Sequence, residues 1–127
     1  MLTLGRKKMN DIIQVLGVDL LNTREVNKIF SDSGYQYDAF CNKVSRHVAE
    51  EYLKEEMSFL DADTIMNNLY SLMLEHCKSH AFPQPAFDIF SAFDAGEYHH
   101  RGDPEDSNAE ELYTKPSLIK LMEGAKA

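Results

Sequence analysis

The sequence predicts an all-α protein: a single-domain bundle of five or six helices with a central antiparallel helical hairpin. Apolar residues recur at three- and four-residue spacing along most of the chain, which is the period of an α-helix. Runs that alternate apolar and polar residues and are rich in β-branched side chains, as strands are, are nearly missing. A length of 127 residues suits one domain with one sizeable core. These three observations set the expected fold class.

Two helices are expected in the N-terminal third. Residues 1–7 are predicted to form a flexible arm, and a first helix follows at about residues 8–16. The second helix is opened by Asn22 or Thr23 as N-cap, because side chains of these types accept a hydrogen bond from a free backbone N–H. Its apolar periodicity fades at Gly34.

The central hairpin is expected from the third and fourth helices. The third, about residues 37–57, carries an apolar stripe of Phe40, Cys41, Val44, Val48 and Tyr52. The segment SFLDADT then interrupts the pattern, so Asp61 or Asp63 is the predicted N-cap of a fourth helix at about residues 64–79. Its apolar face runs from Ile65 to His80, with Asn67 and Asn68 on the opposite, polar side. Because the connection is short, the two helices should be antiparallel neighbours.

The C-terminal part is expected to hold two further helices. Pro85 suits the first turn of a fifth helix, PAFDIFSAFDA, which Gly96 stops. Residues 97–108, EYHHRGDPEDSN, are predicted to form an acidic surface loop. A short turn and a last helix from about Pro116 follow. The phenylalanine-rich fifth helix is expected to be apolar on more than one face, which would suit a partner such as a second copy of the chain, giving a homodimer.

Charge and composition restrict the function classes. The net charge is −8, with eight Lys/Arg against nine Asp/Glu in residues 1–56 and five against twelve in residues 57–127. The acidic second half should repel nucleic acid and anionic membranes and favour a basic partner. The two cysteines, Cys41 and Cys77, are expected to be small buried apolar residues in a reducing compartment, so the cytoplasm is the predicted location.

The leading hypothesis is a small, acidic, all-helical protein that acts by protein–protein binding and needs no cofactor. Immunity proteins and antitoxins that inhibit basic partners have this profile of size and charge. The contact is expected at and after the acidic loop, with Tyr98, Tyr113 and Phe93 as aromatic anchors. The predicted partner-binding residues are Tyr98, His99, Asp103, Glu105, Asp106, Glu110, Glu111 and Tyr113.

A DNA-binding regulator is the first alternative. Residues 16–35 have the pattern of a helix-turn-helix, and TREVNKIFSDSGY resembles the recognition segments of phage and bacterial regulators over barely a dozen residues. Arg24, Asn27 and Lys28 would then point outward to contact the duplex.

A metal-dependent enzyme is the second alternative. His76 and His80 lie one turn apart, and a hairpin whose turn centres near Leu60 would bring His47 and Glu51 beside them. Such a set suits zinc or iron. The HExxH pattern, phosphate loops and the GxSxG nucleophile motif are missing from the sequence, so no catalytic residues are predicted.

Overall fold

The computed structural model describes the backbone of residues 2–79 and 81–126 and the side chains of residues 8–79 and 81–124. This part of the chain is helical and contains no strand, which confirms the predicted all-α fold. Its elements are α1 (Leu2–Val18), α2 (Thr23–Ser33), α3 (Tyr37–Leu53), α4 (Phe59–His76), α5 (Ala86–Ala95), the π-helical segment η1 (Glu110–Thr114) and α6 (Lys115–Lys126).

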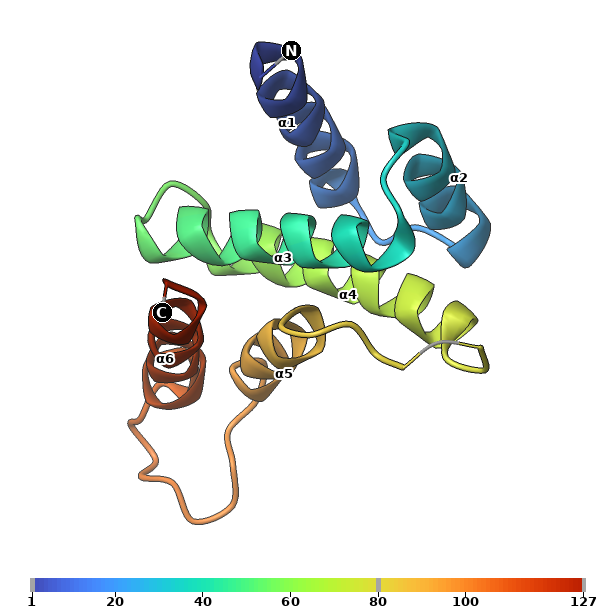
Figure 1. Ribbon diagram of the computed structural model, residues 1–127. Coiled ribbons are helices and arrows are strands. Elements are labelled where there is room, and N and C mark those ends of the chain that lie inside the picture. Colours follow the sequence, from blue (N-terminus) through green and yellow to red (C-terminus); the bar gives the residue numbers. More distant parts are fainter. Residues whose placement is uncertain (1, 80, 127) are drawn as a thin grey trace.

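The central hairpin is formed by α3 and α4, which run antiparallel through the middle of the molecule (Figure 1). On one side α1 and α2 pack against it, chiefly against α4. On the other side α5 and α6 cover it, and η1 joins them. The core therefore lies on both faces of the hairpin, and every residue of the apolar stripe expected on α3 is buried in it.

Helix α2 begins and ends where the sequence indicates. Asn22 accepts a hydrogen bond from the Glu25 backbone N–H at 2.9 Å, and Glu25 accepts one from the Asn22 N–H at 3.2 Å. This reciprocal capping box satisfies two donors that a helix start leaves free. Gly34 ends the helix with φ = 78°, a conformation that glycine adopts at little cost.

Helix α3 ends earlier than predicted, and no glycine marks its end. Glu55 has φ = 62°, and its N–H donates to the Tyr52 carbonyl while the Glu56 N–H donates to the Glu51 carbonyl. This is the hydrogen-bond pattern of a Schellman motif, in which glycine usually occupies the left-handed position. Because a glutamate occupies this position, the sequence does not indicate where the helix ends. The prediction that the helix continues to Met57 is therefore wrong.

Helix α4 correspondingly starts earlier than predicted. Its N-cap is Ser58, whose hydroxyl accepts from the Asp61 N–H at 3.1 Å. The expected caps were therefore wrong: Asp61 lies in the first turn and Asp63 in the second. At the N-terminal end, α1 begins at Leu2 and so extends over residues of the predicted arm.

The burial of Asn68 also differs from the prediction. This residue was placed on the polar side of α4, but only 1% of it is exposed. Its amide nitrogen donates to the carbonyls of Leu16 and Asp19, at 2.8 and 2.9 Å, and its oxygen accepts from the Leu21 N–H at 2.8 Å. Because α1 and α2 pack on that side of α4, a polar position becomes a buried one that satisfies the backbone of their connection.

The monomer itself covers both faces of α5. Ile89, Phe90 and Phe93 are buried between α3, α4 and α6, and the ring of Phe87 stacks on Phe82 at 4.6 Å. The apolar side chains of α5 thus pack within the chain, with Phe87 only partly buried. Cys77 was also misplaced: Cys41 is buried as predicted, but Cys77 follows the last turn of α4 and is exposed.

No helix among the described residues combines the length and the apolar character that a membrane crossing requires.

Candidate functional site

The acidic loop, residues 97–108, connects α5 to η1 at the end of the bundle away from α1 and α2 (Figure 1). Its own side chains hold its backbone. His100 Nε2 lies 2.7 Å from the Ala95 carbonyl oxygen, and His99 Nε2 lies 2.7 Å from that of Pro104. A carbonyl oxygen only accepts, so each ring nitrogen must carry a proton. Both histidines, which the sequence placed in a solvated loop, therefore donate hydrogen bonds that hold the backbone of the loop.

Aromatic contacts join the acidic loop to η1. The His100 ring lies between Tyr98, at a centroid distance of 4.5 Å, and Tyr113, at 4.0 Å. The Tyr113 hydroxyl donates to Asp103 at 2.7 Å, and this bond lowers the pKa of the Asp103 carboxyl below its usual value. Asp103 also accepts from the His100 N–H at 3.2 Å. The loop is thus fixed at both ends and in the middle.

The predicted partner-binding residues divide into internal and exposed groups. Glu110 accepts a hydrogen bond from the Tyr52 hydroxyl of α3, and Phe93 is wholly buried, so neither is available as a contact or an anchor. Glu111 is exposed and pairs with Lys115 at 2.6 Å. Among the predicted partner-binding residues of the loop, the exposed side chains without a hydrogen bond inside it are Glu105, Asp106 and Tyr98, whose ring is 54% exposed.

A carboxyl cluster lies at the base of the acidic loop. The Asn67 amide of α4 donates to Asp63 and to Glu97, each at 3.2 Å, and Asp94 adds its charge. Burial, followed by the hydrogen bond and charge of Glu97, raises the pKa of Asp63 to about 8. The pKa of Asp94 is also raised, first by burial and then by Glu97. The Asp63 carboxyl, at the base of the acidic loop, therefore keeps its proton near neutral pH.

Replacing Asp63 with Asn should make the protein more stable at alkaline pH. A folded-state pKa above the unfolded value means that the folded protein holds the proton more tightly, so the free energy of unfolding falls as pH rises from about 4 through about 8. Asp63→Asn keeps the hydrogen-bonding shape without the charge. At pH 9 it should gain about 1–2 kcal/mol, because the half-exposed site is partly screened by water.

Urea denaturation of both proteins at pH 5, 7 and 9 measures this difference. Burial lowers the pKa of His47, which gives stability the opposite dependence on pH. This contribution is the same in both proteins, so it cancels when the variant is compared with the parent. Asp11→Asn, an exposed change on α1, is the matched control and should keep the parental pH profile. An equal stability gain for Asp63→Asn at all three pH values would contradict the retained proton.

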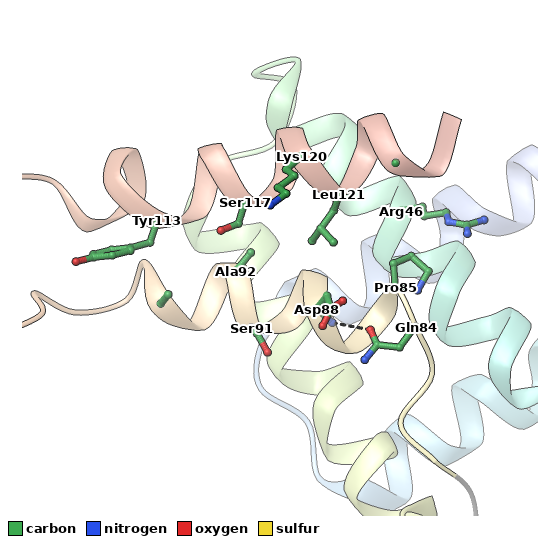
Figure 2. A pocket seen from close by; sticks show the side chains of 12 residues that line it. Arg46, Gln84, Pro85, Asp88, Ser91, Ala92, Tyr113, Ser117, Lys120 and Leu121 are labelled. Carbon is green, nitrogen blue, oxygen red and sulfur yellow. Dashed lines mark hydrogen bonds between the residues drawn. The ribbon is translucent and has the colours of Figure 1, made fainter. Parts of the chain in front are cut away.

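A hollow of the surface lies beside the acidic loop, between α5 and α6 (Figure 2). It is a groove of about 820 Å³, which is within the range of small-molecule sites. Its lining comes from α3, α5 and α6, and Tyr113 at one end belongs also to the loop's aromatic cluster. No residue pattern in the sequence indicated this groove, because its walls meet only in the tertiary structure.

The three proposed metal ligands that the structure describes, His47, Glu51 and His76, do not converge. His47 pairs with Glu51 at 3.5 Å near α1, whereas His76 stacks on Tyr37 at 4.5 Å, with Nε2 3.3 Å from the side-chain oxygen of Asn27. His80 lies outside the described residues. Among the described residues, no three His, Cys, Asp or Glu side chains are grouped so that they could hold a metal ion.

The register of the hairpin explains this error. The hairpin turn lies between Leu53 and Phe59, not around Leu60. Tyr37 therefore lies level with His76, and His47 lies level with Ile65. At a rise of 1.5 Å per residue, His47 and His76 are about 16 Å apart along the helix axis.

Two of the three DNA-binding candidates, Arg24 and Lys28, are exposed and lie one turn apart on α2. Of these, Lys28 pairs with Asp32 at 3.0 Å. Asn27, expected to point outward, is half-buried and faces His76. Helix α2 packs chiefly against α4, so the contact with its neighbour accounts for its apolar pattern.

Comparisons of the chain with protein-family models, curated proteins and solved structures found no match. What the fold and the site define is a small six-helix bundle that presents a structured acidic loop beside a groove.

Proposed function

We propose that the protein acts by protein–protein binding and that its acidic loop docks on a basic partner. The observation that carries the proposal is the fixed conformation of this loop: His99, His100 and Tyr113 hold its backbone while Glu105 and Asp106 face solvent. A loop that is already ordered loses less conformational entropy on binding. Complementary charge speeds encounter and selects the partner.

The net charge of −8 supports an inhibitor of a basic protein, of the type represented by immunity proteins and antitoxins. A cytoplasmic location fits the two unpaired cysteines, one of them exposed, because exposed thiols persist in reducing compartments. Self-association is a weaker proposal, because α5 is covered within the monomer. It would have to use other exposed apolar side chains, such as Val15, Val18 and Leu20.

Neutralising the exposed carboxylates should slow partner binding. A partner is first captured at low salt and identified, and its association rate is then measured by stopped flow. We expect Glu105→Gln/Asp106→Asn to reduce the rate roughly fivefold at 50 mM salt, because electrostatic steering is lost, with a smaller difference at 500 mM.

The matched control is Asp11→Asn/Glu75→Gln, which removes the same charge from exposed positions on α1 and α4. It should stay within twofold of the parent, because steering depends on where the charge lies. Captured partners without a basic bias, or an equal loss in both double variants, would refute the assignment to the acidic loop.

A further inference from the structure

The groove between α5 and α6 has an apolar floor. Ala92 and Ala95 of α5 and Leu121 of α6 line it. The small alanine side chains leave the hollow that larger residues would fill. Figure 2 shows Leu121 pointing into it and Tyr113 at its far end.

The charged residues of the groove differ from those of the rest of the surface. Lys120 of α6 points toward α5, and Arg46 of α3 lies at the end near Pro85 (Figure 2). Neither takes part in the salt bridges found among the described residues. Among the described residues, Asp88 is the one carboxylate that lines the groove. The groove therefore carries a net positive charge on a chain of −8, which favours an anionic ligand.

The helices that form the groove favour an anion with a hydrocarbon chain over an anionic peptide. Both walls are α-helices whose interior backbone groups are already hydrogen-bonded, so they offer few partners to a peptide backbone. The hydroxyls of Ser91, Ser117 and Tyr113 are too few to satisfy a donor and an acceptor from every residue of a bound peptide. A hydrocarbon chain needs no such partners and gains from contact with alanine and leucine.

We propose that this groove binds a medium-chain carboxylate, with the hydrocarbon along the alanine floor and the carboxylate against Lys120. The groove follows η1 and α6 from Tyr113 to Gly124, about 16 Å at 1.5 Å per residue. A chain of medium length fits this span. Asp88, on the opposite wall, repels the carboxylate and so favours the position at Lys120.

The test is calorimetric titration of the full chain with dodecanoate and, separately, dodecanol, below their aggregation concentrations. We expect one saturable site that prefers dodecanoate about fivefold, because only the carboxylate pairs with Lys120. Lys120→Gln should remove this preference and leave dodecanol binding unchanged. Lys78→Gln, an exposed change of the same charge, should keep it. Asp88→Asn should tighten dodecanoate binding about twofold.

A steric variant locates the site. Ser117→Trp places a large ring in the groove and should abolish binding of both ligands. Ile119→Trp on the same helix, at an exposed position outside the groove lining, should bind as the parent does. Equal affinity for the two ligands, unchanged binding by Ser117→Trp, or binding of a polyglutamate peptide but not of dodecanoate would overturn the proposal.

Discussion

Replacing Asn68 with Ala should cost about 3 kcal/mol of unfolding free energy, the largest expected effect of any polar substitution in this protein. The Asn68 side chain makes three hydrogen bonds of 2.8–2.9 Å to the backbone of the α1–α2 connection. Its removal leaves two carbonyls and one N–H with little access to water, and each unsatisfied group costs about 1–3 kcal/mol. Water can enter the space that the side chain leaves, so the expected loss of unfolding free energy is smaller than the sum of the three costs.

Thermal and urea denaturation measure this loss, which corresponds to a fall in melting temperature of about 10 °C. Asn10→Ala is the matched control on an exposed position of α1 and should change stability by less than 0.5 kcal/mol. Hydrogen exchange gives a second measurement: the Leu21 N–H should lose protection in Asn68→Ala more than amides of α5 do. If Asn68→Ala were as stable as Asn10→Ala, the role assigned to this amide would be wrong.

Replacing Gly96 with Ala should cost about 2–3 kcal/mol, because the added methyl has no room. An added Cβ would overlap Thr114 Oγ1 and would lie 3.0 Å from a carbon of the Phe59 ring. Thr114 cannot move freely, because its buried hydroxyl donates to the Ala92 carbonyl at 2.7 Å. The requirement for glycine here is close packing, since φ at Gly96 is −85°, which any residue adopts.

Gly124→Ala is the matched control, because no atom of the described residues lies within 4 Å of its added Cβ. On the exposed face of α6 it should be neutral or stabilise by up to about 1 kcal/mol. The double variant Gly96→Ala/Thr114→Ala should be more stable than the sum of the two single changes predicts, because the second change removes the overlapping oxygen. Strict additivity would show that Thr114 is not the obstacle.

The acidic loop was predictable as a location but not as a structure. Its proline, glycine and carboxylates indicated an exposed acidic connection, and the structure bears out a segment without helix or strand. The bonds of His99 and His100 to carbonyls, and the use of Glu110 by Tyr52, have no sequence signal. They depend on how α5 and η1 are brought together, which only side-chain packing decides.

The sequence by itself determined the helical class, the capping box of α2 and the apolar stripe of α3, because these follow from contacts between residues within about four positions of one another. The tertiary structure alone decided the register of the hairpin, the burial of Asn68 and the groove between α5 and α6. The chain turns back at Glu55, which has a left-handed conformation, rather than near Leu60, and this shifts the pairing between α3 and α4. Local periodicity shows which face of a helix is apolar, whereas the residues opposite that face are set by where the chain turns back.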